Sequence, residues 1–327
     1  MIYYVCPDTD SPSGGVKKIY NHVDILNSTG ISACVLHKSS GFRCRWFNNS
    51  TRISCLRKTS LQDTDYVVIP EFYGLLYIHP YKKHPEYRFF DKIFHSPAKK
   101  VVFNQGTYLT FNGNSFDKDE LINIHTDKDV LATMVVSEDG REFFQYTFPR
   151  SVVFRVHNAI DSNTFYYCPA KKRQLCFMPR KNRDHAVNVI NMLKFRGALS
   201  DFEIVPIDNT TENETVAILQ ESLIFLSFGY PEGFSLPPAE AMSCGCIVIG
   251  YHGMGGKEYF KQDFCFPVET GNIILFTKTV ERVLDIYRKD PESLAEMGRK
   301  ASAHIKENYS TEKEQNDVLR FWNTLLN

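Results

Sequence analysis

The sequence predicts an α/β protein in which strands and helices alternate to form two parallel, doubly wound sheets. Short apolar runs such as Ile2–Val5 and Leu223–Phe228 have the length and composition of buried strands. Stretches whose apolar residues follow a helical spacing separate these runs, and such an alternation is typical of parallel sheets. With 327 residues, 43% of them hydrophobic, the chain is long enough to bury two cores.

In the first half, a polar loop after the strand Ile2–Val5 leads to Gly14 and Gly15, and a helix is expected over residues 17–26. Glycines at the start of a helix let backbone amides approach an anion. Gln105 lies just past another expected strand, at the sheet edge where open parallel sheets bind ligands. The other strands expected in this half cover residues 31–36, 66–70, 100–104, 133–137 and 152–156.

Two acidic triplets, residues 8–10 and 63–65, have the D-x-D spacing of a metal clamp. The first lies in a loop rich in proline and serine, where aspartate caps turns, and the second merely precedes a strand. We therefore predict no bound metal and no cofactor.

The segment 71–94 is unusually rich in aromatic residues, with basic residues interleaved. One interpretation is an acceptor or membrane-interface surface, since aromatic and basic side chains suit sugars and anionic lipid carriers. The other interpretation, which we favour, is a core helix with a solvated basic face. The residues concerned are Phe72, Tyr73, Tyr77, Tyr81, Lys82, Lys83, His84, Tyr87, Arg88, Phe89, Phe90, Lys92 and Phe94.

The second half is expected to start a new sheet with a strand over residues 174–178. This strand is followed by Arg180 and Lys181. Cations at the carboxyl end of a strand suit a diphosphate leaving group, and arginine offers a fork of donors to phosphate oxygens. The further elements expected here are a strand over 202–207 and helices over 184–195, 212–222, 273–288, 291–308 and 311–325.

The most informative stretch is the strand Leu223–Phe228 with the loop and helix that follow it. The helix is expected over residues 236–243, and the next strand over Cys246–Gly250. Ser235 is a good N-cap, and the prolines after it remove only amide hydrogens that have no helical partner. The loop before the helix therefore lies outside the carboxyl end of a strand, where open α/β sheets bind ligands.

Two carboxylates frame this region, Glu232 in the loop and Glu240 in the helix. Between them lie Gly233, where backbone can approach a ligand closely, and the helix N-terminus, which attracts an anion. Amides that bind phosphate, flanked by carboxylates that bind hydroxyl groups, suit a sugar nucleotide.

Seven residues separate Glu232 from Glu240, and the segment EGFSLPPAEAMSCGCIVIG resembles EGFGL-P-x-x-EAMA-x-G-x-PVI of the retaining GT-B glycosyltransferases of family 4, glycosyl transferases group 1. The resemblance implies two Rossmann-like domains that face a cleft. It also implies that Glu240 contacts the ribose, while Glu232 and the backbone after it contact the donor sugar. The backbone residues concerned are Gly233, Phe234, Ser235 and Leu236.

The loops after the first strands resemble the same family more loosely. Gly14 and Gly15 are similar to the family's glycine pair that faces the donor phosphate. Gln105 stands near the place where members often have a polar residue, sometimes a histidine, that touches the sugar. The resemblance therefore adds Gly14, Gly15 and Gln105 to the donor-binding residues.

The sequence departs from the family at the expected diphosphate site. Members usually have an arginine with a lysine five positions later, whereas here His185 follows Arg180 at that offset. We expect Arg180 and Lys181 to substitute for the usual pair, with Arg183 as a further candidate.

The resemblance also predicts the domain boundaries. Residues 157–165 resemble the N-G-I-D-x-x-x-F segment that closes the first domain of the family, with an alanine in place of the glycine. We therefore expect an N-terminal acceptor-side domain over 1–165 and a nucleotide-sugar-binding domain over 172–310. A last helix, 311–327, is expected to cross back to the first domain.

The composition narrows the functional classes. Lysine plus arginine and aspartate plus glutamate both number 38, so no net charge attracts nucleic acid or an anionic membrane. The nine cysteines lack paired spacings and indicate reduced thiols. Neither a signal-peptide pattern nor an apolar run of membrane-spanning length is present, so we expect a cytoplasmic protein with at most peripheral membrane association.

The predicted function is therefore transfer of a sugar, with retention, from a nucleoside-diphosphate sugar to a hydroxyl of a carbohydrate or lipid-linked acceptor. The expected context is synthesis of cell-surface polysaccharide or glycoconjugates. The alternative is a non-catalytic sugar-nucleotide binder or partner subunit with the same fold. A further alternative is an enzyme of this fold with another reaction, such as an epimerase or a phosphorylase.

Overall fold

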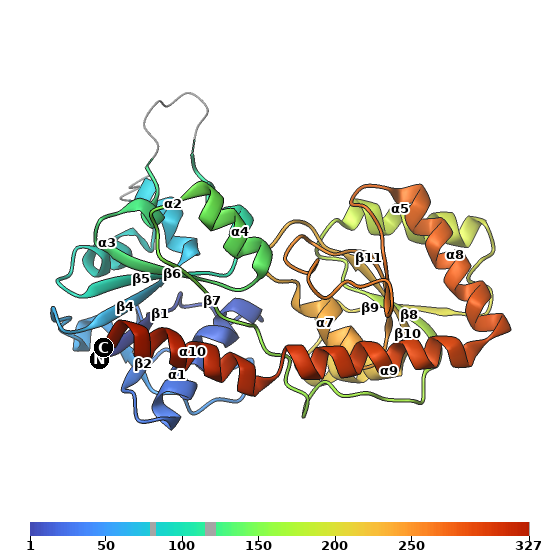
Figure 1. Ribbon diagram of the computed structural model, residues 1–327, viewed down its shortest axis with the longest axis horizontal. Helices are drawn as coiled ribbons and strands as arrows, with labels where there is room; N and C mark the ends of the chain where they lie inside the picture. Colours follow the sequence, from blue (N-terminus) through green and yellow to red (C-terminus); the bar gives the residue numbers. More distant parts are fainter. Residues whose placement is uncertain (79–82, 115–121, 327) are drawn as a thin grey trace. The chain divides into compact units, whose positions relative to one another are not determined.

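The computed structural model divides into two compact units, whose elements are labelled in Figure 1. Unit 1 comprises residues 1–157 and 314–327, and unit 2 comprises residues 158–313. The residues that the structure describes are 1–78, 83–114 and 122–326.

Unit 1 is built on seven parallel strands in the order β3-β2-β1-β4-β5-β6-β7. The order reverses between β1 and β4, because β2 and β3 extend the sheet on one side and β5 to β7 on the other. The carboxyl ends of β1 and β4 therefore flank a topological switch point, here named switch point 1. The strands are β1 (Ile2–Val5), β2 (Ala33–His37), β3 (Ile53–Cys55), β4 (Tyr66–Pro70), β5 (Lys99–Asn104), β6 (Val130–Val135) and β7 (Val153–Arg155).

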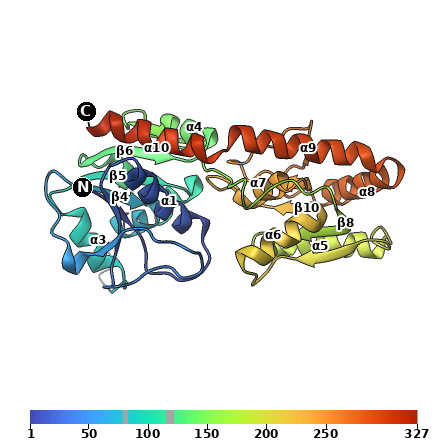
Figure 2. The same cartoon turned by 90° about the horizontal axis from the view of Figure 1, so that it is seen from below.

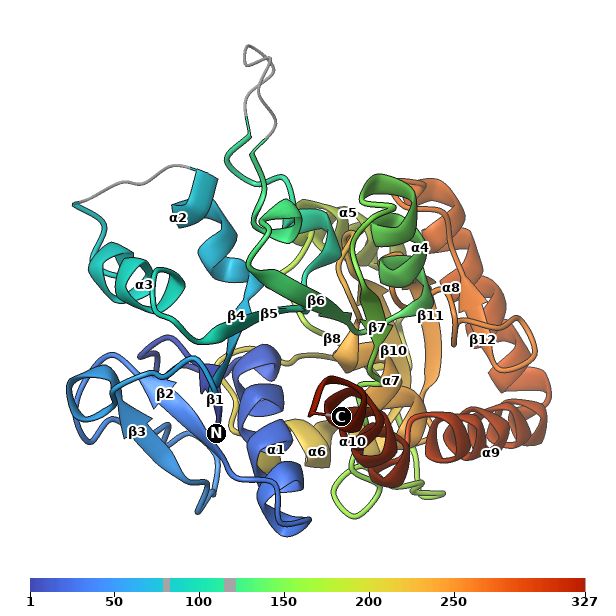
Figure 3. The ribbon, with the colours of Figure 1, turned by 60° about the vertical axis from the view of Figure 1, so that its left-hand side comes forward.

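Helices cover both faces of this sheet. Figure 3 shows α2 and α3 on one side of β4 and β5, and α1 and α10 on the other. Side chains alternate along a strand, so Tyr4 contacts α10 while Val5 joins the core beneath α3. The elements are α1 (Gly14–Ser28), α2 (Gly74–Ile78), α3 (Tyr87–Phe94), α4 (Glu138–Thr147) and α10 (Thr311–Leu326), with short 3-10 turns that include η2 (Glu71–Tyr73) and η3 (Thr107–Leu109).

Helix α3 accounts for much of the aromatic segment. Arg88 and Lys92 are exposed on its outer face. The core helix with a solvated basic face, which the sequence analysis favoured, is therefore confirmed over residues 87–94, whereas Tyr81 and Lys82 lie outside the described residues. The buried side chains of α3 are Phe89, Phe90, Ile93 and Phe94.

The last helix completes the core of unit 1. Trp322 is fully buried, and its Nε1 donates a hydrogen bond to Tyr4 Oη at 3.1 Å. Lys18 on α1 and Glu314 on α10 form a buried ion pair at 2.8 Å. Removing one partner of such a pair leaves an uncompensated buried charge, which costs roughly 3–5 kcal/mol. The end of the chain therefore packs against the sheet that its beginning forms, as the sequence predicted.

Unit 2 is built on five parallel strands in the order β12-β11-β10-β8-β9. Here the order reverses between β8 and β10, whose carboxyl ends flank a second reversal, named switch point 2. The strands are β8 (Lys172–Phe177), β9 (Glu203–Pro206), β10 (Ser222–Phe228), β11 (Ile247–Tyr251) and β12 (Cys265–Pro267).

Two layers of helices enclose the second sheet. Helices α5 and α8 pack on the face that presents Ile224, Leu226 and Phe228 of β10. Helices α6, α7 and α9 lie on the opposite face (Figures 1 and 2). The helices are α5 (Arg183–Phe195), α6 (Glu212–Glu221), α7 (Leu236–Ser243), α8 (Ile273–Lys289) and α9 (Pro291–Asn308).

Some local features differ from the sequence predictions. Helix α1 begins at Gly14, so both glycines lie in its first turn instead of before it. Strands β3 and β12 were not expected, because three residues give too short an apolar run to recognise. The predicted first domain extended to residue 165, whereas residues 158–165 belong to unit 2, where Ile160 N–H donates to Tyr309 O at 2.8 Å. In the described part of the chain, no helix has the length and apolarity of a membrane span.

Candidate functional site

Switch point 2 carries the strongest concentration of predicted site residues. The loop after β8 contains Arg180 and Lys181, and the loop after β10 contains Glu232. Both loops leave the sheet at neighbouring carboxyl ends, because β8 and β10 pair directly. Ligands of open α/β sheets bind at such a place.

The Glu232 carboxylate is held at both oxygens. Lys181 Nζ donates to Oε2, and Ser235 Oγ donates to Oε1. Its backbone is fixed as well, since Glu232 N–H donates to Gly253 O at 3.1 Å and Gly255 N–H donates to Glu232 O at 3.2 Å. The side chain stays partly exposed, so an oriented carboxylate is available to a ligand.

Lys181 is positioned by the turn that contains it. Asn182 adopts a left-handed backbone with φ of 46°, and its Nδ2 donates to the carbonyls of Phe228 and Gly229, both at 3.0 Å. This contact ties the loop after β8 to the end of β10. The Lys181 ammonium also lies 5.0 Å from the ring centroid of Tyr230, within the range of a cation–π contact.

The other side chains considered for the diphosphate site make no contact with Glu232 among the hydrogen bonds and ion pairs of the described residues. Arg180 and Arg183 are exposed. The His185 ring packs edge-on against the Tyr251 ring, with 5.7 Å between centroids. His185 therefore faces the end of β11, and the structure gives Lys181, not His185, the contact with Glu232.

The start of α7 corrects one prediction from the sequence. Ser235 stands at the N-cap, but its hydroxyl makes no capping hydrogen bond. An N-cap side chain accepts from the second or third helical N–H, and here Pro237 and Pro238 occupy these positions without an N–H. The hydroxyl is therefore free to bind Glu232. The helix start also offers fewer amides to an anion than the sequence analysis assumed.

The backbone after Glu232 is rigidly supported. Phe234 is buried, with its ring 5.3 Å from that of Tyr259, so only its main chain is open to a ligand. Tyr259 Oη donates to the Ser235 carbonyl. Gly233 is buried and Leu236 is partly exposed.

Glu240 lies further along α7 and is half-buried. It follows Ala239, which is fully buried in the core of unit 2. The helix therefore presents Glu240 at the border between core and solvent. Its contact with a ribose stays a prediction.

A glycine-rich loop, residues 253–256, packs against the Glu232 loop. A Cβ on Gly253 would lie 2.8 Å from Ser235 Oγ, and one on Gly255 would lie 2.0 Å from the Gly233 carbonyl oxygen. Only glycine therefore permits this contact. The glycines of this loop are a recognisable signal of close backbone approach.

In unit 1, the predicted residues gather at switch point 1. Gly14 and Gly15 form the first turn of α1. Gln105 follows β5, and its Nε2 donates to the Gly15 carbonyl at 3.1 Å. Gln105 thus links two loops of the same sheet edge. Donor binding by Gln105, Gly14 and Gly15 stays a prediction.

Sequence reasoning missed Glu71 at this edge. Glu71 directly follows β4, is partly exposed, and lies beside the backbone of Gln105 and Gly106. Burial raises the pKa of the Glu71 carboxyl to about 7, against the lowering effect of backbone N–H groups that include those of Gln105 and Gly106. The available signal was its place, since a carboxylate directly after a buried apolar strand lies at a ligand-binding edge.

The acidic triplets stabilise loops. Asp8 accepts from His37 Nδ1 at 3.1 Å and from Ser39 N–H at 2.9 Å, and Asp10 pairs with Arg45 at 2.9 Å. The described residues contain no group of three or more histidine, cysteine, aspartate or glutamate side chains arranged to hold a metal.

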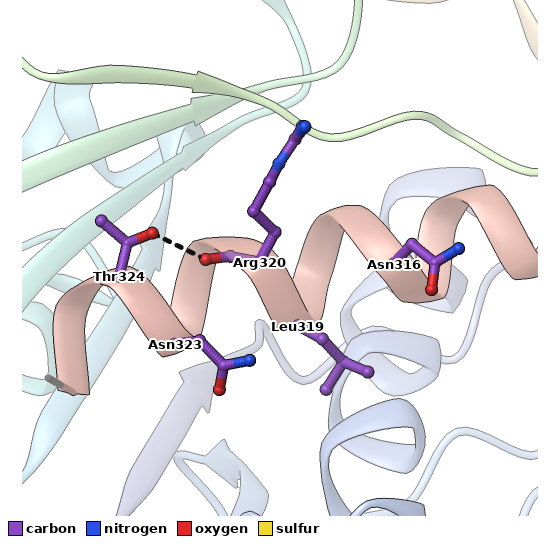
Figure 4. Close-up of a pocket in the computed structure, with 5 residues that line it drawn as sticks. All are labelled: Asn316, Leu319, Arg320, Asn323 and Thr324. Atoms are coloured by element: carbon purple, nitrogen blue, oxygen red, sulfur yellow. Dashed lines mark hydrogen bonds between the residues drawn. The ribbon is translucent and has the colours of Figure 1, made fainter.

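A surface hollow of about 480 Å³ lies along one face of α10 (Figure 4). Another, of about 410 Å³, lies along α8. Neither is lined by a residue predicted for the site. The first hollow is lined by Asn316, Leu319, Arg320, Asn323 and Thr324.

Comparison with known families supports the resemblance between unit 2 and the glycosyltransferases. Residues 181–302 match the sequence model of the family described as glycosyl transferases group 1. The matched segment contains Lys181, Glu232 and Glu240. It covers the loop after β10 and helix α7, and the loop after β8 from Lys181 onward.

Whole-chain relatives extend the similarity to unit 1. The chain is 24% identical over 292 residues to alpha-1,6-glucosyltransferase of Actinobacillus pleuropneumoniae serotype 7, covering 86% of this chain and 83% of that protein. Sucrose-phosphate synthase from Thermosynechococcus elongatus has a similar structure with a TM-score of 0.70 at 10% identity, over 99% of this chain and 98% of the other. HepE of Anabaena in complex with UDP-glucose gives a TM-score of 0.67 at 12% identity, over 99% of both chains. These likenesses establish the GT-B fold.

Proposed function

We propose that this chain, whose residues 181–302 match glycosyl transferases group 1, is a glycosyltransferase that uses a nucleoside-diphosphate sugar and retains the anomeric configuration. The observation that carries the proposal is Glu232, held by Lys181 and Ser235 at switch point 2 inside the matched segment. The E-x7-E pair of Glu232 and Glu240 favours family 4.

UDP-glucose is the donor that we propose to test first. The relative from Actinobacillus is named an alpha-1,6-glucosyltransferase, and the HepE structure contains UDP-glucose. By the same argument, the first acceptor is the primary hydroxyl of a glucoside. Lipid-linked carbohydrates are the second acceptor class.

In the proposed reaction, the acceptor oxygen forms a bond to the anomeric carbon as the bond from that carbon to the diphosphate oxygen breaks. The acceptor attacks from the face where the diphosphate leaves, and a phosphate oxygen takes the acceptor proton. Lys181 and Arg180 stabilise the negative charge that develops on the diphosphate, an electrostatic contribution worth several kcal/mol. Glu232 accepts a hydrogen bond from a sugar hydroxyl and fixes the ring.

Lys181 and Glu232 form an ion pair in which each group neutralises the other. A diphosphate competes with Glu232 for the Lys181 ammonium, and the carboxylate is then available to the sugar. Donor binding therefore forms the contact between Lys181 and the diphosphate and the contact between Glu232 and the sugar at the same time.

Glu240 has a separate role in this proposal. A ribose contact is equally strong in the ground state and the transition state, so it contributes to donor binding more than to the chemical step. Glu240→Ala should therefore raise the KM for the donor by at least tenfold with a smaller change in kcat. A change confined to kcat contradicts the ribose assignment.

The decisive experiment is a screen of the purified full-length chain with a panel of nucleoside-diphosphate sugars and methyl β-D-glucoside. Release of the nucleoside diphosphate reports turnover, and NMR of the product reports the anomeric configuration. An α-linked product from UDP-glucose supports retention, whereas a β-linked product contradicts it. Binding of UDP, seen as a raised melting temperature, without any turnover favours the non-catalytic alternative.

The wider assignments remain predictions. These are synthesis of cell-surface polysaccharide or glycoconjugates, a cytoplasmic location with at most peripheral membrane association, and a reaction without a bound metal. Activity that survives a chelator would support the last of these. Activity lost with the chelator and restored by a divalent cation would overturn it.

A further inference from the structure

We propose that the Glu71 carboxylate, beside the backbone of Gln105 and Gly106 at switch point 1, binds a hydroxyl group of the sugar acceptor next to the one that reacts. This inference rests on the proposed glycosyltransferase function and assigns unit 1 a part in it. The acceptor class is a carbohydrate that presents a free hydroxyl.

The place of Glu71 in the fold is the first argument. It follows the last residue of β4 directly, and β4 pairs with β1 across the reversal in strand order. The first turn of α1, with Gly14 and Gly15, follows β1 on the other side of the same reversal. Glu71 therefore lies at the edge position where parallel α/β sheets bind ligands.

The second argument is close packing that fixes the carboxylate. A Cβ on Gly106 would lie 3.0 Å from Glu71 Oε1 and 3.0 Å from Leu109 Cδ1. The absence of a side chain at residue 106 thus leaves room for the carboxyl group. Gln105 also binds the Gly15 carbonyl, so the loops after β1, β4 and β5 converge here.

The surroundings suit a sugar. Phe72, next in the chain, and Leu109 keep 50% and 54% of their surfaces exposed. A sugar ring has apolar C–H faces and hydroxyl groups around its edge. Exposed apolar side chains can pack on the faces, and a neighbouring carboxylate can bind the hydroxyl groups. A carboxylate accepts hydrogen bonds only, which matches a hydroxyl donor.

Burial also makes Glu71 costly to keep charged. Beside its carboxyl lie the backbone N–H groups of Gln105 and Gly106 and its own backbone N–H, none of which titrates. Among the described residues, no cation forms an ion pair with it. A carboxyl with a pKa of about 7 loses its proton within the neutral range, and the resulting carboxylate accepts a hydrogen bond from a second hydroxyl of the acceptor.

The proton balance of the transfer is unchanged by this role. Glu71 accepts a hydrogen bond from a second hydroxyl of the acceptor, not from the reacting one, and so orients the acceptor. The acceptor proton still passes to the leaving diphosphate when the new glycosidic bond forms. Glu71 therefore ends the reaction in the state in which it began.

The test separates acceptor use from donor chemistry in the full-length protein with UDP-glucose. UDP release without acceptor measures hydrolysis, and transfer to methyl β-D-glucoside measures acceptor use. Glu71→Gln should leave hydrolysis within about twofold and lower kcat/KM for the glucoside at least tenfold. Glu142→Gln, an exposed glutamate of α4 in the same unit, is the matched control and should change neither rate.

The pH profile adds a readout that a structural role would not move. Transfer by the wild type should rise as pH increases through 7, because more Glu71 is ionised, and transfer by Glu71→Gln should lose this rise. Glu71→Asp keeps the charge on a shorter side chain, so it should raise the glucoside KM yet keep the pH dependence. It also serves as the second variant if Glu71→Gln expresses poorly.

Equal transfer by Glu71→Gln and Glu142→Gln at every pH would overturn the assignment while leaving the proposed function intact. Failure of the wild type to release UDP from any donor sugar would contradict the proposed function, and this inference with it. Loss of hydrolysis together with transfer in Glu71→Gln would also overturn it, because that result places Glu71 in donor chemistry.

Discussion

Glu71 and Glu232 occupy equivalent positions in two units of similar design. Each follows a strand that pairs with the first strand of its sheet across a reversal in strand order. Glu232 is neutralised by Lys181 and held by Ser235, whereas Glu71 is stabilised by backbone N–H groups alone and has a pKa of about 7. The fold therefore supplies the position, and the neighbouring side chains decide the chemistry.

The difference matches two kinds of ligand. A cation beside a carboxylate suits a donor that carries both a diphosphate and hydroxyl groups. A carboxylate without a cation suits a neutral acceptor sugar. The comparison thus predicts that variants at switch point 2 change donor chemistry, while variants at switch point 1 change acceptor use and stability.

A large effect is expected at the cation, Lys181. Lys181→Met should lower UDP release from UDP-glucose on the order of tenfold to a hundredfold, because it removes charge from the leaving diphosphate and leaves Glu232 unpaired. Arg180→Met is the matched variant, and its exposed side chain predicts a smaller loss. A larger loss in Arg180→Met than in Lys181→Met would show that the structure assigns the cation incorrectly.

A hydroxyl deletion at Ser235 should have the next effect. A hydrogen bond to a charged group contributes about 1.5–3 kcal/mol, so Ser235→Ala should lower kcat for UDP release by at least about tenfold. Ser235→Thr keeps the hydroxyl and should retain most of the activity. Equal activity in Ser235→Ala and the wild type would mean that Ser235 does not orient Glu232.

The pKa of Glu71 makes the stability of unit 1 depend on pH. Its folded-state pKa of about 7 lies above the ordinary value of 4.5, so folding favours the protonated carboxyl. The stability that Glu71 contributes is therefore fully present below pH 4.5 and is lost as pH rises through 7. Glu71→Gln does not titrate, so its melting temperature should exceed that of the wild type by roughly 2–4 °C at pH 8, and by less at pH 5.

Tryptophan fluorescence measures this effect in the relevant unit. Both tryptophans of the chain, Trp46 and Trp322, belong to unit 1. The fluorescence transition therefore reports unit 1. If Glu71→Gln instead lowers the melting temperature at pH 8, the Glu71 carboxylate stabilises the fold. That result would contradict its assignment to acceptor binding.

The smallest effect concerns helix caps in unit 2. Thr211 caps α6 in a capping box, in which its Oγ1 accepts a hydrogen bond from Glu214 N–H. Thr211→Ala should therefore cost about 1 kcal/mol of unfolding free energy, measured by circular dichroism. Thr211→Ser keeps the hydroxyl and should cost less. A larger cost in Thr211→Ser than in Thr211→Ala would contradict the capping role.

The sequence predicted the features that long patterns encode. Strands such as β10, seven consecutive buried residues, were recognisable from apolar runs, and the E-x7-E segment located Glu232. Strands β3 and β12 escaped because three edge residues give almost no pattern. The sequence predicts that Ser235 stands at an N-cap. It does not predict that the hydroxyl binds Glu232, which follows because two prolines remove the N–H donors of the usual cap.

The role proposed for Glu71 could be recognised only from the three-dimensional structure. Its importance depends on strand order, on the space left by Gly106 and on the backbone around its carboxyl. None of these is local in sequence, since residues 71 and 106 belong to loops after different strands. The single clue available beforehand was a carboxylate directly after an apolar run.

The most direct test of the account is UDP release from UDP-glucose by Glu232→Gln beside Glu281→Gln. Both glutamates are ion-paired in unit 2, with side-chain exposures of 21% and 22%, so the two variants remove similar charges from similar surroundings. The account predicts that Glu232→Gln loses about two orders of magnitude in turnover, while Glu281→Gln keeps the wild-type rate. Equal rates in the two variants would contradict it.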